Sequence, residues 1–204
     1  MTITSGTRLV SSPRNLGATI VDGGVHFSVW APNARNVTVL YANRDGSWAE
    51  SAPLERSGDG IHAGIVADAG AGTLYQYKLD GGIPFPDPWS RFQPDGPHGP
   101  SEVIDPNVYQ WGDAEWGGLT PDGLVIYECH VGTYTPDGTY TALREQLPAL
   151  KALGITALEL MPVAQCPGRW NWGYDGVDLF APSNAYGRPD DLKRLIDAAH
   201  SQDL

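Results

Sequence analysis

The chain has 204 residues, of which 41% are hydrophobic and 10% aromatic, and it carries a formal net charge of −11 at pH 7. This length and composition are enough for one large domain or two small ones with a buried core. The acidic balance argues against nucleic acid or an anionic membrane surface as a partner, because both need a basic patch, and it suits a neutral ligand.

The two cysteines, Cys129 and Cys166, have no CxxC spacing. They predict reduced thiols in a cytoplasmic protein rather than a disulfide framework. Residues 1–16 are expected to form an N-terminal tail. The N-terminus lacks the charged start and long apolar run of a signal peptide, so no signal peptide is expected. No stretch of the sequence is apolar over the length of a membrane span, so no membrane partner is expected.

Short strands are predicted from residue 17 onward. In GGVHFSVWAP, Val25, Phe27 and Val29 recur at every second position, which is the period of a half-buried strand. The same period groups three further sets: Val37, Val39 and Tyr41; Ile61, Ala63 and Ile65; Tyr75 and Tyr77. Turns rich in Gly, Pro and Asn close these strands and indicate an antiparallel, immunoglobulin-like β-sandwich over residues 17–105.

Residues 84–100 contain six prolines, which exclude a central strand or a helix. The segment also holds Phe85, Trp89 and Phe92, which make it too apolar for a free linker. We therefore expect an ordered strap packed between two domains, followed by a linker over residues 106–122.

The hydrophobic pattern after residue 123 is that of an α/β domain. Two nearly continuous apolar runs, at 124–131 and 155–163, are typical of parallel strands buried on both faces. A helix is predicted between them, with Thr139 as its N-cap, Gly154 at its C-terminus and Pro148 as the site of a kink. Its apolar face is formed by Leu143, Leu147, Leu150 and Leu153.

A second amphipathic helix is predicted after residue 188, through Leu192, Leu195 and Ile196. The order strand, helix, strand, loop, helix is the opening of an α/β domain with a parallel sheet. Two parallel strands cannot close a barrel, so the chain is expected to be the front piece of a longer protein.

Glu128 and Glu159 interrupt the two apolar strands and are the first candidates for chemistry. On adjacent strands their carboxylates could approach each other, and retaining glycosidases use two carboxyl groups about 5 Å apart. The alternative is that each is a buried structural acid paired with an arginine or a backbone donor. Because strand pairing alone brings such residues together, we favour the structural interpretation.

Cys129 and His130 stand at the end of the first strand, where a barrel would place its active face. Neighbouring residues of a strand point to opposite faces, which excludes a nucleophile–base pair, and His130 is expected to be a satisfied core residue. The other histidines are scattered without metal-ligand spacing, and the sequence has no phosphate loop and no GxSxG motif. We expect neither a metal nor a cofactor.

The loop PGRWNWGYDGVDLFAPSNAYG (167–187) is unusually aromatic. Its rings either fill a small core beneath the loop or form a platform for a sugar, whose C–H faces and hydroxyl rim fit flat rings beside polar groups. Both interpretations stay open for Trp170 and Trp172. We favour a ligand role for Tyr174, which precedes Asp175 on the predicted C-terminal face of the sheet.

Several segments carry a resemblance to a known family. VIYECHVGTYTPDGTY, LGITALELMPV, NWGYDGVDLFAPSNAYG and PDDLKRLIDAAH resemble the start of the catalytic TIM (β/α)8 barrel of glycoside hydrolase family 13, the α-amylase superfamily. The sandwich, with FSVWAPNARNVTVLY, is similar to the CBM48-like N-terminal domain of the isoamylase, branching-enzyme and trehalohydrolase branch. The segments PDPWSRFQPDGPHGPSEVIDP and PGRWNWGYDGV narrow the resemblance to the malto-oligosyltrehalose trehalohydrolases.

The resemblance implies that residues 123–204 begin the barrel of a retaining hydrolase. Such an enzyme cleaves the α-1,4-glucosidic bond of maltooligosyl-trehalose to release trehalose, so the expected partner is an α-glucan or maltooligosyl-trehalose. The catalytic Asp, Glu and Asp of the family lie on later strands, beyond Leu204, and this chain alone is expected to be inactive. The family's GYD tyrosine, matched by Tyr174, stacks on the glucose ring next to the scissile bond, with Trp172 and Asp175 as supports.

Two alternatives stay open. The first is a fragment of an isoamylase-type debranching enzyme or a glycogen-branching enzyme. The second is a non-catalytic carbohydrate-binding protein that uses the sandwich, which would need an exposed aromatic pair there. Trp30, Trp48 and Trp89 are the candidates for that pair.

Overall fold

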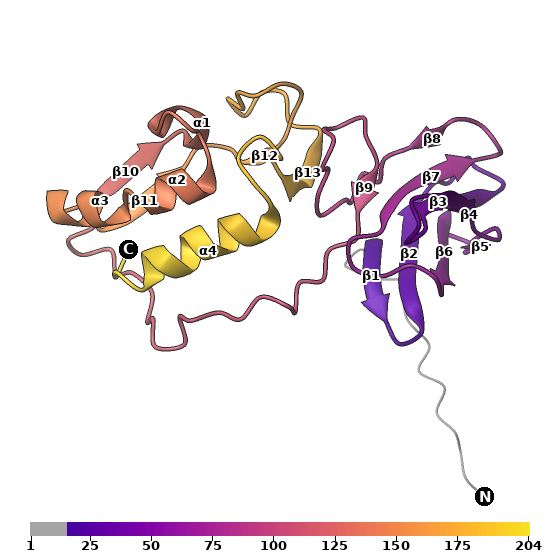
Figure 1. Cartoon of the computed structure of the whole chain (residues 1–204), viewed down its shortest axis with the longest axis horizontal. Coiled ribbons are helices and arrows are strands. Elements are labelled where there is room, and N and C mark those ends of the chain that lie inside the picture. Colours follow the sequence, from indigo (N-terminus) through magenta and orange to yellow (C-terminus); the bar gives the residue numbers. More distant parts are fainter. Residues whose placement is uncertain (1–15) are drawn as a thin grey trace, which may run out of the picture.

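The computed structural model describes residues 16–204, and the predicted tail, apart from Leu16, lies outside the described residues. Figure 1 shows a group of strands and a group of helices with short strands, connected by the strap and by the chain that follows it. None of the helices within the described range is long and apolar enough to cross a membrane.

The strand-rich part consists of two antiparallel sheets, as predicted (Figure 1). The first sheet has the order β1 (Gly17–Val21), β2 (Gly24–Trp30), β6 (Ile61–Val66) and β5 (Glu55–Arg56). The second has the order β4 (Trp48–Glu50), β3 (Val37–Ala42), β7 (Leu74–Leu79) and β8 (Pro84–Phe85), and β9 (Ser101–Glu102) also pairs with β7.

The core between these sheets follows the predicted alternation in three strands. Val25, Phe27 and Val29 of β2 are buried, and so are the predicted sets of β3 and β7. Tyr75 packs edge-on against Phe27, with ring centroids 4.8 Å apart. Alternating apolar residues therefore predict the inner face wherever the opposite face is polar or mixed.

Strand β6 is the exception, because the prediction assigned its faces the wrong way round. The register pairs His62 with Val29 and Val66 with Val25, which turns His62 and Val66 inward. Ile65 points outward and is largely exposed. Neither ring nitrogen of His62 has a hydrogen-bond partner among residues 16–204, although the side chain is fully buried.

The strap of residues 84–100 is ordered and contacts both halves of the chain, as predicted. On the sandwich side, the buried Asp87 accepts hydrogen bonds from the hydroxyl of Tyr75 at 2.6 Å and from the backbone N–H of Trp89 at 2.8 Å. On the other side, Trp89 stacks on Phe180 with ring centroids 4.3 Å apart. The strap thus joins the core of the sandwich to the second half of the molecule.

The predicted linker of residues 106–122 is fastened to the last helix. Asp197 accepts hydrogen bonds from the Tyr109 hydroxyl at 3.0 Å and from the Gly112 backbone N–H at 2.9 Å. Asp113 lies 2.7 Å from Nδ1 of His200, and the ring of His200 stacks on a linker tryptophan, Trp116, at 3.5 Å. These contacts hold the segment against the helix despite its lack of regular structure.

The second half contains the predicted pair of parallel strands and its helices. Its elements are β10 (Ile126–Cys129), α1 (Val131–Tyr134), α2 (Tyr140–Arg144), α3 (Leu147–Leu153), β11 (Ala157–Leu160), β12 (Ala164–Gln165), β13 (Asp178–Pro182) and α4 (Pro189–His200). β10 and β11 are parallel. α4 is the amphipathic helix expected after residue 188, with Leu195 buried.

The helix predicted before Gly154 is broken in two rather than kinked. Thr139 caps the start of α2, where its hydroxyl accepts the backbone N–H of Ala142 at 3.2 Å. α2 ends at Arg144, and Pro148 lies in the first turn of α3, where a missing N–H leaves no hydrogen bond unmade. Gly154 ends α3 with φ of +97°, a conformation that glycine adopts readily.

The strands β10 and β11 are covered on one face only, although both faces were predicted to be buried. Tyr127 and Leu158 pack against the cluster formed by the helices. On the other face Ile126 is 55% exposed, and Glu128 and Glu159 are exposed as well. Within the described residues these two strands pair only with each other, and the face that carries Ile126, Glu128 and Glu159 is left exposed.

Replacing His62 by leucine should stabilise the sandwich. A buried polar group without a partner costs about 1–3 kcal/mol, and an apolar side chain of similar size removes that cost. We expect His62→Leu to raise the melting temperature, measured by circular dichroism, by about 4 °C. His26→Leu, a change at a half-buried position on the outer face of the same sheet, is the control and should shift it little.

A fall in the melting temperature of His62→Leu would contradict this account. It would mean that the imidazole makes an interaction that leucine cannot replace.

Candidate functional site

The aromatic loop lies between two short antiparallel strands. Ala164 of β12 pairs with Pro182 of β13, and Gln165 pairs with Asp178, so the two ends of the loop 166–177 come together. The sequence predicted an open loop at this place, because a strand of two residues has no hydrophobic period to detect. The hairpin limits the positions that the rings between its strands can take.

The centre of the loop is anchored by Asn171, which is almost fully buried. Its side chain donates to the carbonyl oxygen of Ala164 at 2.6 Å and accepts the backbone N–H of Gly173 at 2.8 Å. Its own backbone N–H donates to the hydroxyl of Tyr186 at 2.9 Å, and its carbonyl oxygen lies 3.0 Å from Nε2 of His130. Four hydrogen bonds to four different residues therefore fix this one position.

His130 is buried at the end of β10 and contacts the loop through the carbonyl oxygen of Asn171. A carbonyl oxygen only accepts, so Nε2 carries the proton. Nδ1 of His130 is buried and has no hydrogen-bond partner in the part of the chain that the structure describes. The prediction of a satisfied core histidine is therefore correct for one ring nitrogen and wrong for the other.

Tyr174 is the most exposed large side chain of the loop, at 90%. Gly173 has φ of +88°, and a Cβ atom there would lie 2.6 Å from Cγ of Pro162. Only glycine fits this close approach, which lets the chain turn away from Pro162. The ring of Tyr174 has no ring contact and its hydroxyl no hydrogen bond among residues 16–204, and the neighbouring Asp175 is exposed too.

Trp170 and Trp172 flank the buried Asn171 in the sequence and are both exposed. Trp172 is 61% exposed, and its ring centroid lies 5.6 Å from that of His130. Trp170 is about half exposed, and its ring centroid lies 6.3 Å from that of His130. The guanidinium carbon of Arg169 lies 4.9 Å from the centroid of the Trp170 ring. Each ring is thus partly buried against the end of β10 and partly open to a ligand.

The predicted site residues lie on the outer surface of this one loop. Tyr174, Trp172 and Asp175 are all exposed, and no ring contact joins Trp172 to Tyr174 within residues 16–204. Sequence reasoning missed Asn171, which holds them, because its partners lie up to 41 positions away. An asparagine between two tryptophans would have been the only local signal.

Glu128 and Glu159 are directly opposite each other in the register of β10 and β11. Both are exposed, and neither makes a hydrogen bond or an ion pair in the described range. The expectation that they are buried and paired structural acids is therefore wrong, since the face that they occupy is uncovered. Burial raises the pKa of the adjacent Cys129 thiol to about 11, which keeps it protonated and excludes a nucleophilic role at neutral pH.

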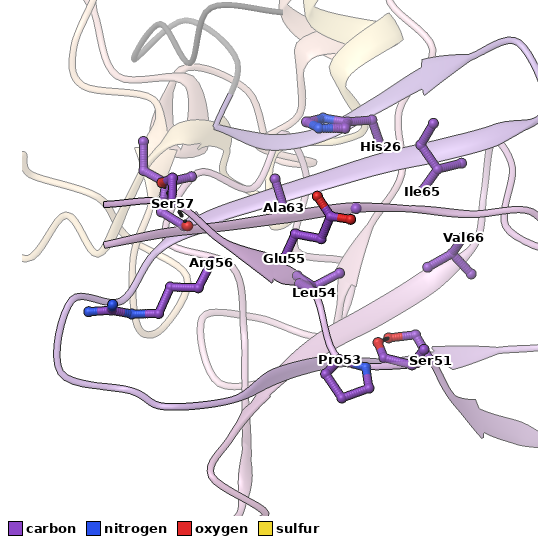
Figure 2. A pocket seen from close by; sticks show the side chains of 13 residues that line it. His26, Ser51, Pro53, Leu54, Glu55, Arg56, Ser57, Ala63, Ile65 and Val66 are labelled. Atoms are coloured by element: carbon purple, nitrogen blue, oxygen red, sulfur yellow. Dashed lines mark hydrogen bonds between the residues drawn. The ribbon is translucent and has the colours of Figure 1, made fainter. Parts of the chain in front are cut away.

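The sandwich carries a separate hollow of about 650 Å³, where the chain crosses from β4 to β5. Figure 2 shows His26 and Ile65 on one side of it and Ser51 and Pro53 on the other. Its lining includes no Trp, Tyr or Phe.

The tryptophans expected to form an aromatic pair on the sandwich do not do so. Trp30 lies in β2 of the first sheet and Trp48 in β4 of the second. The third candidate, Trp89, is half-buried and stacked on Phe180. No ring contact joins any two of these three tryptophans within residues 16–204, so they do not form the pair that the non-catalytic alternative requires.

Asp178 opens β13 and is buried beside the strap. One of its carboxylate oxygens has no hydrogen-bond partner within residues 16–204. Burial raises the pKa of Asp178 to about 6, and the charge of nearby His98 opposes that shift. The pKa of Asp87 is also raised to about 6, chiefly by burial and further by the charge of Asp178. Two buried carboxyl groups of raised pKa therefore meet where the strap touches the hairpin.

Comparison with known proteins gives two family matches. Residues 15–107 match carbohydrate-binding module 48 (isoamylase N-terminal domain), and residues 88–204 match the alpha amylase catalytic domain. The two matches overlap in the strap. They confirm the predicted fold class, a β-sandwich followed by the first part of a (β/α)8 barrel.

The similar proteins are much longer than this chain. It is 45% identical over 187 residues to the malto-oligosyltrehalose trehalohydrolase of Deinococcus radiodurans, a match that covers 91% of this chain and 30% of that protein. It is 36% identical over 197 residues to the 1,4-alpha-glucan branching enzyme GlgB of Nocardia farcinica, covering 89% of this chain and 26% of that protein. The chain therefore spans about 30% or less of the length of these curated relatives.

A solved structure is also similar to this chain over most of its length. A protein from Salmonella typhimurium that carries the provisional name alpha amylase is 43% identical to this chain and superposes with a TM-score of 0.84, covering 93% of this chain and 32% of that one. Together with the curated relatives, it confirms the resemblance predicted from the loop and the strap.

Asp178→Asn should stabilise the chain in a pH-dependent way. A carboxyl group whose pKa is raised in the folded state from 3.8 to about 6 stabilises the fold fully below pH 3.8 and loses that contribution as the pH rises through about 6. At pH 8 we therefore expect the variant to melt a few degrees above the wild type. Near pH 4 the difference should be small, because the carboxyl group of the folded state is then protonated and carries no buried charge.

The control for this comparison is Asp175→Asn, a change of an exposed carboxylate in the same loop. It should leave the melting temperature unchanged at both pH values. A stabilisation by Asp178→Asn that is larger at pH 4 than at pH 8 would reverse the sign of the linkage and contradict the assignment.

Proposed function

Because the chain belongs to the alpha-amylase family, we propose that it forms the front part of a retaining glycoside hydrolase that releases trehalose from maltooligosyl-trehalose. The observation that carries this proposal is its similarity to the malto-oligosyltrehalose trehalohydrolases, which extends over nearly the whole chain. The substrate is a neutral glucan, which suits a chain of net charge −11.

Within that enzyme, the aromatic loop binds the sugar and Tyr174 is its platform. The ring offers a flat apolar face to the C–H groups of a glucose residue. Exposed polar groups such as the carboxylate of Asp175 accept hydrogen bonds from its hydroxyl groups. Trp172 and Asp175 support the platform from either side. The exposure of Tyr174 and its lack of partners favour this role, because a ring that filled a core would be buried.

A platform of this kind contributes to catalysis by position. A glucose ring stacked on a fixed aromatic side chain has lost most of its freedom to rotate, so the bond to be cleaved is held where the reacting groups meet it. The hydrogen bonds of Asn171 supply that fixation. The nucleophile and the acid/base belong to later strands of the barrel, which the resemblance places after Leu204.

A branching or debranching enzyme is the second candidate, and the similarity to a 1,4-alpha-glucan branching enzyme favours it. The two functions differ in their products. The test uses a protein that contains this chain and has the full length of its relatives. We expect that protein to release trehalose from maltotriosyl-trehalose, as detected by chromatography. Formation of branched chains from amylose without any trehalose would overturn the first proposal and favour the second.

Replacing Tyr174 tests the platform directly. In the protein at that length, Tyr174→Ala should lower kcat/KM for maltotriosyl-trehalose by roughly tenfold or more, because the loss of ring contact and positioning is worth on the order of 1.4 kcal/mol. Tyr174→Phe keeps the ring and should retain most of the activity.

Val177→Ala, a change of another exposed side chain of the same loop, is the matched control and should have little effect. The melting temperature of Tyr174→Ala should stay within about a degree of the wild type, since exposed side chains contribute little to stability. A large fall in its melting temperature with unchanged activity would show that the ring fills a core.

A further inference from the structure

A cavity of about 480 Å³ lies where the sandwich meets the second half of the molecule. It is enclosed by β1, the strap, the chain that follows β9, the end of β13 and one side of α4. In Figure 1 the chain that leaves β9 passes below α4. Junctions between domains are common places for ligand sites, and the volume is in the usual range for them.

Two aromatic rings of the cavity are held in position and half exposed. Phe180 is stacked on Trp89 through one face and is still 47% exposed, so its remaining face and edge are accessible. Trp111 is 45% exposed and packs edge-on against Tyr109, with ring centroids 5.0 Å apart. The rings come from segments about 70 positions apart, and the fold brings both to one cavity.

Polar groups of both kinds stand beside these rings. Arg91 and Asn107 line the cavity, and within residues 16–204 neither the guanidinium nor the side-chain amide makes a hydrogen bond. The carboxylate of Asp105 is held by the backbone N–H of Asn107 at 2.9 Å. The lining thus offers free donors, free acceptors and apolar ring faces together.

The charges of the lining favour an uncharged ligand. Lys193 is neutralised by Asp190, whose carboxylate lies 3.1 Å from its ammonium group. Asp105 offsets Arg91, so the cavity has no excess of positive charge to attract an anion. The cavity offers flat apolar faces and a mixture of hydrogen-bond donors and acceptors. These are the groups that bind the C–H faces and the hydroxyl groups of a sugar chain.

We infer that this cavity is a second glucan-binding site, distinct from the Tyr174 platform, and that it takes a short segment of an uncharged α-1,4-glucan between Trp111 and Phe180. The choice of a glucan rests on the proposed function. The site holds the substrate chain at the junction of the two halves. Arg91 and Asn107 bind its hydroxyl groups.

The test separates the two sites by using Tyr174→Ala as the background. Calorimetric titration of the 204-residue chain carrying Tyr174→Ala with maltotriose should still give saturable binding. Adding Trp111→Ala should weaken that binding by about tenfold, because one of the two ring contacts is lost. Leu179→Ala, at the exposed residue next to Phe180 but outside the cavity lining, is the matched control and should leave the affinity unchanged.

A second variant guards against misfolding. Arg91→Gln changes an exposed side chain without hydrogen bonds, so it should weaken maltotriose binding while the melting temperature stays that of the background. Inorganic phosphate, titrated in parallel, should give no saturable heat. Saturable heat with phosphate alone would overturn the choice of an uncharged ligand.

Two further results would overturn the inference. One is loss of all maltotriose binding in the Tyr174→Ala background, which would leave the platform as the single site and the proposed function intact. The other is an affinity that neither Trp111→Ala nor Arg91→Gln changes. Failure of the proposed function itself is detected separately, by the absence of trehalose release from the protein at the length of its relatives.

Discussion

The four hydrogen bonds of Asn171 hold the aromatic loop against the end of β10, and the arrangement of every exposed ring near them follows from this anchor. A loop of this composition would otherwise sample many conformations, because its glycines cost little to rotate and its tryptophans have several burial options. Burying one amide removes most of that freedom. The exposed rings on either side are therefore already ordered before a flat ligand binds, which lowers the entropic cost of binding.

The strap gives the two halves a shared structure. Asp87 ties it to the sandwich through Tyr75, while the Trp89–Phe180 stack and the hydrogen bond from Asn184 to the Pro94 carbonyl oxygen, at 2.8 Å, tie it to the β12–β13 hairpin. Residues 88–100 of the strap belong to both family matches. Because the hairpin carries the aromatic loop, the strap couples the position of that loop to the sandwich.

Local signals in the sequence predicted most of the fold, and the failures are of one kind. β2, β3 and β7 were predictable because one face of each strand is apolar and the other is polar or mixed, and Thr139 and Gly154 mark helix ends through their own chemistry. The inner face of β6 was not predictable, because the register with β2 turns the polar His62 inward. Glu128 and Glu159 were predicted to be paired, but what covers a strand face depends on distant neighbours. The exposed Tyr174 could be singled out as a candidate ligand residue, whereas Asn171 owes its role to partners from three other segments.

The fastening of residues 106–122 onto α4 has a consequence for folding during synthesis. The Tyr109 hydroxyl and Asp197 are 88 positions apart, and Asp113 and His200 are 87 positions apart. The last strand of the sandwich, β9, ends at Glu102. At roughly 5–20 residues per second, a ribosome needs on the order of 5–20 s to add the residues that complete α4. From its own synthesis until α4 is complete, Trp116 lacks its stacking partner His200, so this segment cannot reach its folded packing before the helix is made.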